Sequence, residues 1–502
     1  MKTRHILISM AIAMPFFAVL TANAQSKDFK LGKWTEIHHS IIQELNRSYV
    51  DSLPVDKMMR ESVDAMLKQL DPYTVYIPEE ENEDLQMMIS KTYGGIGAVI
   101  HKKKDENVII NEPYFGSPAH KYGLQCGDEI LEIDGVTTKG LEVKESSDRM
   151  KGKPGTTVVF KVKKVRTADT VNLEIVRERI HFPDIDFCGM IDDTTGYILQ
   201  SGFTEGVAWQ IKDRFLDLKS KGMKRLVLDL RGNGGGLMNE AVNIISLFVP
   251  KGTLAVSSKG NTEDSKRDYY TQAEPIDTEM PIIVMIDGGS ASASEIVSGG
   301  LQDLKRARIM GKTSFGKGLV QSIRPLPYNG QMKITTAKYY TPSGRCVQGV
   351  GVTPDVEIDL PTYSRLVYSL VLGGVIDQYM LKFVQEHDSI ATAEDFHFSD
   401  EQFEDFIAFA KTQDFDYRST AKATFDKMKE ELKEDGLAEV MSTELDALEK
   451  ALEMDKERFI RLKKDEIIPF IEEEIVVRYW FQEAGVKIAL RYDKQLKEAL
   501  TK

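Results

Sequence analysis

Residues 225–236 read RLVLDLRGNGGG, an apolar run that ends in a polar, glycine-rich turn. Apolar residues at helical spacing resume at once, over 237–248. An apolar run, a turn and a helix in succession are typical of an α/β layer, whose strands are buried on both faces. The runs at 281–287 and 306–310 are each followed by glycine in the same way. We therefore predict an α/β domain over residues 181–360.

The glycine-rich turn at 229–236 opens a predicted helix. A helix N-terminus carries unpaired N–H groups and a partial positive charge, which suits a developing oxyanion. Glycines there would let a substrate carbonyl come close. A phosphate cradle uses similar features, but the GxxxxGK[ST] spacing and its lysine are absent from this turn. The turn therefore favours oxyanion stabilisation over nucleotide binding.

A second turn, GGSASASEI at 288–296, follows the predicted strand at 281–287 and leads into another helix. A serine at such a junction has an exposed hydroxyl and neighbouring backbone donors, as acyl transfer requires. Histidine is the usual base for serine. No histidine occurs between His181 and His387, so a histidine triad confined to this domain is excluded.

Lysine can replace histidine when its amine is uncharged, which requires burial or a positive neighbour to lower its pKa from about 10.4. The segment 314–321 reads SFGKGLVQ and places Lys317 between two glycines with apolar neighbours. Gln321 can hold the amine by hydrogen bonding without adding a charge. The rival base is Lys312, whose neighbours give it no apolar enclosure and predict a solvated side chain.

Three segments in this order, DLRGNGGG at 229–236, SASASE at 290–295 and FGKGLVQ at 315–321, resemble the motifs of the carboxyl-terminal processing, or tail-specific, serine proteases. The resemblance extends over residues 35–360 and implies a ClpP/crotonase-like α/β core. It also implies the site residues: Ser292 as nucleophile, Lys317 as general base, Gln321 as its assistant, and the amides of Gly236 and Ala293 as the oxyanion hole.

The choice among the three serines follows from the same resemblance. The separation of 25 residues between Ser292 and Lys317 matches the family interval only for that serine. Ser290 and Ser294 are therefore expected to be turn and helix-cap residues. Glu295 is expected to cap the helix start, where a carboxylate is favoured, and it receives no catalytic role.

The segment 93–176 predicts a small β domain, and strands are expected at 97–100, 108–110, 129–133, 158–162 and 171–176. Its segments YGGIG at 93–97, SPA at 117–119 and GDEIL at 127–131 resemble those of a PDZ domain. The candidate peptide-binding residues are Gly94, Gly95, Ile96 and Gly97. Such a loop can offer several amides to the carboxylate of a protein tail, whose chain would add a strand beside 97–100. The alternative is a structural glycine turn in an ordinary β domain.

The N-terminal residues predict an export signal, with a positive start, an apolar stretch at 6–20 and the small-x-small site Ala22-Asn23-Ala24. We expect the mature chain to begin at Gln25 and to be periplasmic, with membrane association left open. The predicted parts are a signal peptide at 1–24, a helical N-terminal segment at 25–88, a PDZ-like peptide-binding domain at 89–180, the serine protease core at 181–360 and a helical C-terminal extension at 361–502.

Composition excludes several classes of function. The chain has 502 residues, 42% hydrophobic and 28% charged, the balance of a globular multidomain protein. A net charge of −13 argues against nucleic acid as a partner. The three cysteines form neither a complete disulfide framework nor a zinc motif, so no metal and no cofactor are expected.

The function predicted from these patterns is that of an exported serine endopeptidase that binds protein C-terminal tails and hydrolyses peptide bonds through a Ser–Lys dyad assisted by Gln. Its expected partners are proteins with accessible tails, together with an adaptor or a second copy held by the C-terminal extension. The main alternative is a non-catalytic PDZ-type scaffold that binds tails. An acyl-CoA enzyme with a related turn layout is a second alternative, but it leaves the PDZ-like segment and the export signal unexplained.

Overall fold

The computed structural model describes residues 26–102, 106–453 and 455–502. Two compact units divide between Tyr76 and Ile77. The first unit contains α2 (Ser26–Ser48) and α3 (Val55–Leu67). Beyond α3 a carboxylate oxygen of Asp71 accepts the amides of Tyr73 and Thr74, each at 2.8 Å, so a turn stands where proline predicted a break. The predicted signal peptide lies outside the described residues.

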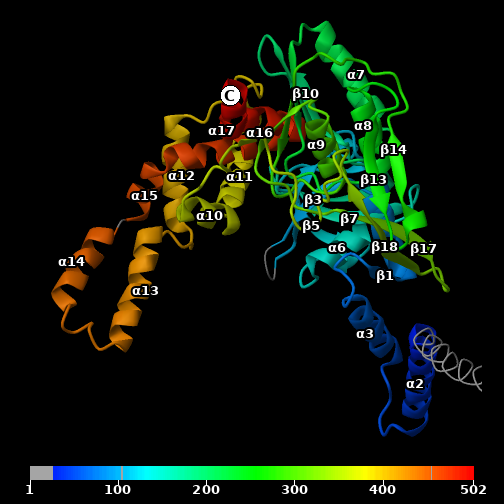
Figure 1. Ribbon diagram of the computed structural model, residues 1–502. Helices are drawn as coiled ribbons and strands as arrows, with labels where there is room; N and C mark the ends of the chain where they lie inside the picture. The colour runs from blue at the N-terminus through cyan, green and yellow to red at the C-terminus, as the bar shows by residue number, and fades with distance from the viewer. Residues whose placement is uncertain (1–25, 103–105, 454) are drawn as a thin grey trace, which may run out of the picture. The chain divides into compact units, whose positions relative to one another are not determined.

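The second unit begins with short elements and the predicted β domain (Figure 1). Its elements are β1 (Val75–Ile77) at the boundary, η1 (Glu79–Glu81), α4 (Asn82–Ser90), β2 (Thr92–Gly95), β3 (Ala98–His101), β4 (Val108–Pro113), α5 (Pro118–Lys121), β5 (Glu129–Ile133), β6 (Val136–Thr137), α6 (Val143–Met150), β7 (Thr157–Lys163), β8 (Thr170–Val176) and β9 (Glu178–His181). The sheet runs β3-β4-β5-β7-β8 with antiparallel neighbours, β6 pairs with β5, and β2 pairs separately with β9.

Buried and exposed residues alternate along the strands of this domain, and the buried ones form its core. Val158, Phe160 and Val162 of β7 are buried, whereas the residues between them point outward. Each strand predicted from the sequence in this region is present within three residues of its expected bounds, and the largest difference is at the end of β4.

The α/β domain follows. Its elements are β10 (Ile185–Met190), β11 (Thr195–Gln200), α7 (Val207–Ser220), β12 (Arg225–Asp229), α8 (Met238–Ser246), β13 (Leu254–Lys259), η2 (Glu263–Ser265), β14 (Arg267–Tyr270), β15 (Ile282–Ile286), α9 (Ala293–Asp303), β16 (Arg308–Gly311), β17 (Leu319–Pro325), β18 (Gln331–Tyr340) and β19 (Val356–Glu357). The main sheet has the order β10-β11-β12-β15-β16-β19 and is parallel except for the β10–β11 pair. Antiparallel pairs also join β17 to β18, β18 to β13 and β13 to β14.

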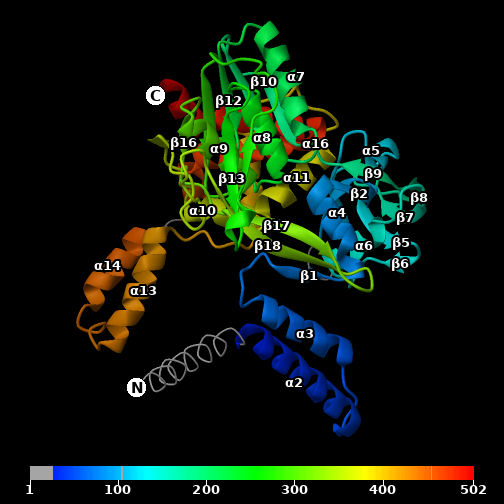
Figure 2. The same cartoon turned by 45° about the vertical axis from the view of Figure 1, so that its right-hand side comes forward.

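Both faces of the main sheet are covered (Figure 2). On one face Leu226 and Leu228 of β12 pack in a core formed with α7, α8 and α9. On the other face Val227 packs in a cluster with Leu496 of α17 and residues of α16. Burial on both sides explains why β12 and β15 read as continuous apolar runs in the sequence.

The C-terminal part is helical. Its elements are α10 (Arg365–Leu372), α11 (Val375–Glu386), α12 (Asp400–Thr412), α13 (Thr420–Glu434), α14 (Ser442–Leu452), α15 (Lys456–Leu462), α16 (Lys464–Tyr492) and α17 (Lys494–Thr501). A core of buried aromatic and aliphatic residues joins α10, α11, α12, α15 and α16. Within the described ranges no single helix is long and apolar enough to cross a membrane, and the bent pair α10 and α11 meets that test only when taken together.

The last helix returns to the α/β domain. The guanidinium of Arg231, in the glycine-rich turn after β12, donates to Asp493 at 2.6 Å, directly before α17. Arg225 of β12 donates to the carbonyl oxygen of Leu500 at 3.1 Å, and Arg308 of β16 donates to that of Lys502 at 2.6 Å. Hydrogen bonds therefore tie the C-terminal residues to both ends of β12 and to the start of β16.

Candidate active site

The two turns singled out in the sequence are fastened to each other at the ends of β12 and β15. One carboxylate oxygen of Asp287 accepts the amide of Gly232 at 2.8 Å and that of Gly289 at 2.9 Å. The hydroxyl of Ser290 donates to the carbonyl oxygen of Leu230 at 2.7 Å. Neighbouring parallel strands bring the two turns to the same edge of the sheet, where α/β domains usually bind their ligands.

Asn233 extends this junction towards the serine motif. Its carbonyl oxygen accepts the amide of Ala291 at 3.0 Å and the hydroxyl of Ser294 at 2.8 Å. Its side-chain oxygen accepts the amide of Gly235 at 2.9 Å. A Cβ atom on Gly235, whose φ is +94°, would lie 2.8 Å from Cβ of Ser292, so the turn packs directly against that serine and only glycine fits there.

Ser292 differs from the two serines beside it. Its backbone has φ 56° and ψ −112°, a strained conformation for a residue with a side chain, and it directly precedes α9. Its side chain is partly exposed, whereas Ser290 and Ser294 are buried with their hydroxyls donating to carbonyl oxygens. The only serine of this motif that can meet a molecule from solvent is therefore Ser292.

The amides of Gly236 and Ala293 belong to the starts of two helices. Gly236 lies two residues before α8, and Ala293 is the first residue of α9. Neither amide donates to an acceptor among the residues that the structure describes. Unpaired donors at helix starts can bind a negatively charged oxygen.

Glu295 joins the serine motif to the lysine motif. Its carboxylate is fully buried in α9. One oxygen accepts the amide of Ser292 at 2.8 Å and the amide of Lys317 at 2.9 Å. The other accepts the hydroxyl of Ser314 at 2.6 Å and the amide of Gly316 at 2.7 Å. A single side chain thus fixes the backbones of both proposed dyad residues.

Tyr339 of β18 provides a second connection between the two motifs. Its hydroxyl lies 3.1 Å from the carbonyl oxygen of Ser292 and 2.8 Å from that of Lys317. Burial and the nearby Glu295 carboxylate raise the pKa of this phenol well above its usual value, so the hydroxyl keeps its proton and serves as a donor. The segments around Ser292 and Lys317 are therefore held at a fixed separation by two buried groups.

Lys317 occupies an environment that favours an uncharged amine. Burial lowers the pKa of Lys317, and the positive charge of Lys333 lowers it further, whereas Glu295 acts in the opposite direction. Close packing explains why glycine stands on either side of Lys317. A Cβ on Gly316 would lie 3.1 Å from the amide nitrogen of Gly351, and a Cβ on Gly318 would lie 2.6 Å from the amide nitrogen of Gln348.

Gln321 and Lys312 are the remaining predicted residues of this region. Gln321 is in β17, and its amide donates to the hydroxyl of Thr335 on β18 at 3.3 Å. Lys312, the rival base, forms ion pairs with Glu357 at 2.8 Å and Asp359 at 2.5 Å. Those hydrogen bonds raise the pKa of Lys312, so its amine is poorly suited to accept a proton.

The predicted peptide-binding residues lie in the β domain rather than at this junction. Gly94 and Gly95 belong to β2, which pairs with β9, and a Cβ on Gly94 would collide with the carbonyl oxygen of Gly152 at 2.1 Å. The side chain of Ile96 is buried in the domain core. Gly97 has φ +73° and its carbonyl oxygen accepts the hydroxyl of Ser117 at 2.8 Å.

Sequence reasoning missed two of the residues that organise the site. Glu295 was expected only to cap α9, and Tyr339 was not considered. The position of Glu295 next to a run of small residues, as in SASASE, is a signal that could have indicated this role, because a buried carboxylate needs several donors. Nothing in the sequence around Tyr339 distinguished it from other tyrosines. No cluster of metal-ligand residues is found among the described residues, and the three cysteines are unpaired.

Comparison with known proteins agrees with this geometry. A protein of Bartonella bacilliformis named "Carboxy-terminal-processing protease" is 33% identical over 389 residues, which cover 76% of this chain and 88% of that protein. The chain belongs to the carboxy-terminal-processing family of serine proteases. The model of "Peptidase family S41" matches residues 194–358, that of the "PDZ domain" matches 85–163, and that of the "Probable PDZ-protease, C-terminal helical domain" matches 366–501.

Other members of this S41 family are similar over shorter stretches. A "Probable CtpA-like serine protease" of Staphylococcus aureus is 33% identical over 332 residues, covering 65% of each chain. Among solved structures, the photosystem II D1 C-terminal processing protease is 28% identical, with a TM-score of 0.38, over 63% of this chain and 86% of that one. The matches of the three family models confirm the predicted fold class, which has a PDZ domain, a serine protease core and a helical C-terminal part.

Proposed function

We propose that this S41 peptidase hydrolyses peptide bonds through Ser292 and Lys317, without a metal or cofactor. One observation carries the proposal: Glu295 and Tyr339 each contact the backbone of both residues, so the two motifs are held together by buried groups. Burial lowers the pKa of Lys317, which favours the uncharged amine that a base needs.

The chemistry proceeds in two stages. The uncharged amine of Lys317 takes the hydroxyl proton as the oxygen of Ser292 attacks the substrate carbonyl carbon, and the amides of Gly236 and Ala293 donate to the resulting oxyanion. The carbon–nitrogen bond then breaks, and the lysine gives its proton to the departing amine. The same lysine then takes a proton from water as the water oxygen attacks the ester carbonyl carbon. The bond from that carbon to the serine oxygen breaks, Lys317 gives the proton to the serine oxygen, and the new C-terminal carboxyl group loses its own proton to solvent. In this scheme the side-chain oxygen of Gln321 holds the amine.

Substitution within the serine motif tests this assignment. Ser292→Ala should abolish the appearance of new peptides from an unstructured test protein, measured by mass spectrometry. Ser298→Ala is the matched control, because Ser298 lies in α9, the helix that Ser292 precedes, is buried, and donates its hydroxyl to the carbonyl oxygen of Ser294. Turnover by Ser292→Ala that equals that of Ser298→Ala would reject the nucleophile.

The base is tested separately. Lys317→Ala removes the amine, and Lys317→Arg replaces it with a group that stays protonated at any working pH. Both variants should be inactive while retaining the unfolding temperature of Ser298→Ala within a few degrees. An active Lys317→Arg would exclude proton transfer by this residue. A wild-type protein that captures tails yet yields no peptides would instead support the scaffold alternative.

We also propose that the PDZ domain recruits substrates by their C-terminal carboxylates, through the amides of the loop Gly94, Gly95, Ile96 and Gly97. Peptides with a free carboxylate should bind more tightly than the same peptides with a C-terminal amide, as measured by fluorescence anisotropy on the Ser292→Ala protein. Equal affinity for the two forms would reject carboxylate capture and favour the structural role of these glycines.

Export and assembly complete the proposal. Residues 1–24 are proposed to direct export and to be removed, so Edman sequencing of the protein recovered from the periplasm should start at Gln25.

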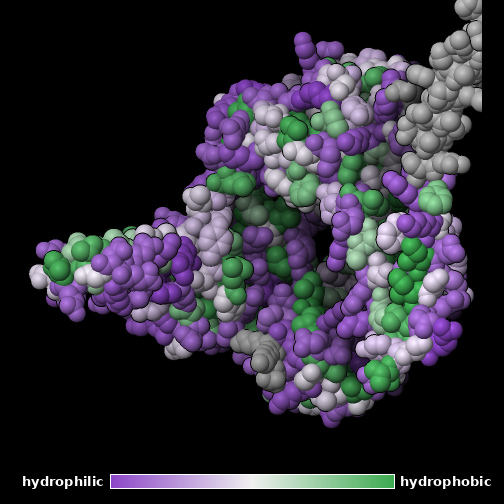
Figure 3. Space-filling view, turned by 60° about the horizontal axis from the view of Figure 1, so that its bottom comes forward, coloured by the Kyte–Doolittle hydropathy of each residue, from purple (hydrophilic) through white to green (hydrophobic). Residues whose placement is uncertain are grey.

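The C-terminal extension, residues 361–502, is proposed to bind an adaptor or a second copy, because hydrophobic residues are exposed between α13 and α14, including Val440, which is 81% exposed. Figure 3 shows this hairpin at the left edge, largely hydrophilic with hydrophobic residues at its tip. Light scattering of Val440→Glu against wild type tests self-association.

A further inference from the structure

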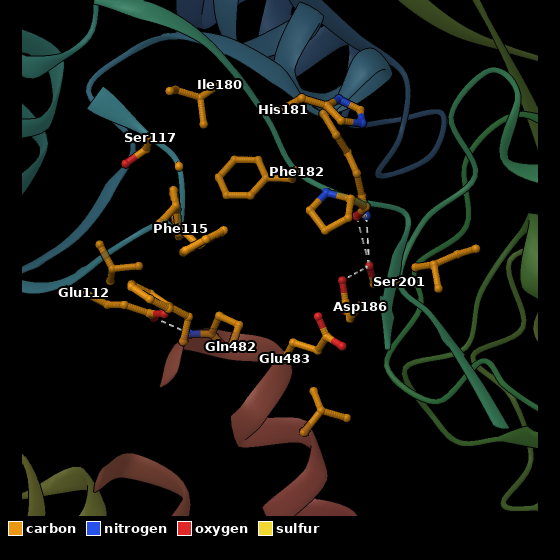
Figure 4. Close-up of a pocket in the computed structure, with 18 of the residues that line it drawn as sticks. Glu112, Phe115, Ser117, Ile180, His181, Phe182, Asp186, Ser201, Gln482 and Glu483 are labelled. Atoms are coloured by element: carbon orange, nitrogen blue, oxygen red, sulfur yellow. Dashed lines mark hydrogen bonds between the residues drawn. The ribbon is translucent and has the colours of Figure 1, made fainter. Parts of the chain in front are cut away.

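A cavity of about 1270 Å³ lies among the PDZ domain, the start of the protease core and α16 (Figure 4). Lys91 and Ser201 are among the residues that line it. Figure 4 shows Ser201 on one wall with Asp186 beside it. Ser201 belongs to a short segment after β11, residues 200–204, which we call the support loop. One end of this loop meets the cavity, and its other contacts lead to the glycine-rich turn of the peptidase site.

Lys91 reaches the support loop from the PDZ domain. It lies between α4 and β2, inside the residues 85–163 that the PDZ model matches. Its amine donates to the carbonyl oxygen of Pro183 at 2.9 Å and to the hydroxyl of Ser201 at 3.0 Å. That hydroxyl donates in turn to the carboxylate of Asp186 at 2.8 Å. The side chain of a PDZ residue is therefore bound to the first part of the support loop.

Asp184 gives the amine of Lys91 a second role. Its side chain is fully buried, and one carboxylate oxygen lies 3.5 Å from Nζ of Lys91 without a hydrogen-bond partner among the described residues. The other oxygen accepts the hydroxyl of Thr204, and the backbone carbonyl oxygen of Asp184 accepts the amide of Ser201 at 2.8 Å. Asp184 thus holds both ends of the support loop. A buried carboxylate needs a counter-ion, and Lys91 supplies it.

The local backbone makes room for this lysine. Lys91 has φ 50° and ψ 32° directly after α4, a left-handed conformation that helices usually end with at glycine or asparagine. A Cβ on Gly202 would lie 2.5 Å from Nζ of Lys91, so only a glycine in the support loop leaves the space that the amine occupies. The fit between the two residues indicates that the position of the amine matters to the loop.

The support loop packs directly against the glycine-rich turn. The carbonyl oxygen of Gln200 accepts the side-chain amide of Asn233 at 2.7 Å. The carbonyl oxygen of Phe203 accepts the amide of Leu237 at 2.8 Å, and a Cβ on Gly236 would lie 2.7 Å from the same oxygen. The residues on both sides of the Gly236 amide are therefore placed by the support loop.

We propose that Lys91 is a positioning residue of the peptidase reaction. Its amine balances the buried charge of Asp184 and fixes the support loop, and the loop holds the amide of Gly236 where it can donate to the oxyanion. Lys91 acts through the loop and takes no part in proton transfer. The inference rests on the proposed function, because it requires that an oxyanion form beside Gly236.

The test compares Lys91→Met with Arg179→Met in the full chain. Methionine has nearly the length of lysine and removes its charge. Arg179 is the matched control, because it lines the same cavity from β9 and is exposed. Cleavage of fluorescein-labelled casein gives kcat and KM. Urea unfolding gives the folded fraction of each variant, and kcat is expressed per folded molecule.

Lys91→Met should lower kcat about tenfold relative to Arg179→Met and leave KM unchanged, because a misplaced oxyanion donor weakens the transition state alone. The pH at which Lys317 loses its proton in the pH–rate profile should match that of the control, because the change lies outside the environment of that lysine. A merely structural role would lower the folded fraction and leave kcat per folded molecule at the control value.

Adding Asp184→Asn to Lys91→Met removes the unpaired buried charge, so the double variant allows the same comparison if Lys91→Met alone does not fold. Both changes break one contact, so the kcat of the double variant should equal that of Lys91→Met and should not show the product of two losses. The proposal is overturned if kcat per folded molecule matches that of Arg179→Met, if KM changes in place of kcat, or if the two losses multiply.

The serine variant separates this inference from the proposed function. Turnover by Ser292→Ala would remove the proposed function and the role of Lys91 with it. An inactive Ser292→Ala together with a Lys91→Met protein that works at the control rate would reject the role of Lys91 alone.

Discussion

The substitution Glu295→Gln tests how the site is held together. The buried carboxylate accepts four donors, two on each oxygen, and a glutamine offers a single acceptor oxygen. The new NH₂ group must therefore face two donors that it cannot accept. Two lost hydrogen bonds to a charged group, at about 1.5–3 kcal/mol each, predict a loss of about 3–6 kcal/mol in the free energy of unfolding of the protease core.

The same change should affect catalysis in two distinguishable ways. Loss of the shared contact loosens the backbones of Ser292 and Lys317, and a displacement of about 1 Å there would lower kcat/KM on the order of 10²-fold. The Glu295 charge raises the pKa of Lys317, so its removal lowers that pKa. The acid limb of the pH–rate profile, where the lysine loses its proton, should therefore move to lower pH.

The assay is cleavage of fluorescein-labelled casein between pH 5 and pH 10, together with urea unfolding. Glu472→Gln is the control, because Glu472 is equally buried in α16 and accepts the amide of Phe398 at 2.8 Å and two side-chain donors. That variant should lose stability without any shift of the acid limb. A Glu295→Gln protein with wild-type stability, or with its acid limb moved to higher pH, would refute the reasoning.

Three further predictions concern the same junction. Lys333→Met removes a positive charge that lowers the pKa of Lys317, so the acid limb should move to higher pH while the plateau rate stays within twofold; an unmoved limb would contradict this. Gly235→Ala should lower kcat at least 100-fold, whereas Gly234→Ala, where a Cβ meets nothing within 4 Å, should remain near wild type in the same peptide assay. Tyr339→Phe removes the donor shared by two carbonyl oxygens and should lower kcat about tenfold with little change in KM, measured under saturating casein.

The strands and helices that have a local sequence pattern could be predicted. The strands β5, β7 and β12 and the helices α8 and α9 follow from apolar period and glycine turns, and they lie within about two residues of their expected positions. The sequence patterns did not place the two turns together; their meeting at one end of the sheet follows from the parallel pairing of β12 and β15. The choice of Ser292 rests on its interval to Lys317 in the family that the sequence resembles, and the partly exposed position and strained backbone of that serine are compatible with the choice.

Features that depend on long-range contacts were not predictable. The environment of Lys317 involves Lys333 on β18, and the contact arises only when the hairpin of β17 and β18 folds beside the serine turn. The cavity beside α16 combines Glu112 with Gln482, which lie far apart in the chain. The sequence around Glu112 does not indicate Gln482, and the reverse is also true, because a contact between side chains of different domains produces no periodic pattern in the sequence. The domain boundaries and the roles of the loop at 94–97 remain predictions.

The return of α17 to the protease core has a practical consequence for handling this peptidase. Arg231 sits in the turn that ends at Gly236, and its guanidinium is also bound to Asp493, so the last ten residues brace the strand end that precedes the proposed oxyanion donors. Affinity tags fused behind Lys502 would crowd the carbonyl that Arg308 contacts. Purification handles and surface immobilisation are better attached elsewhere.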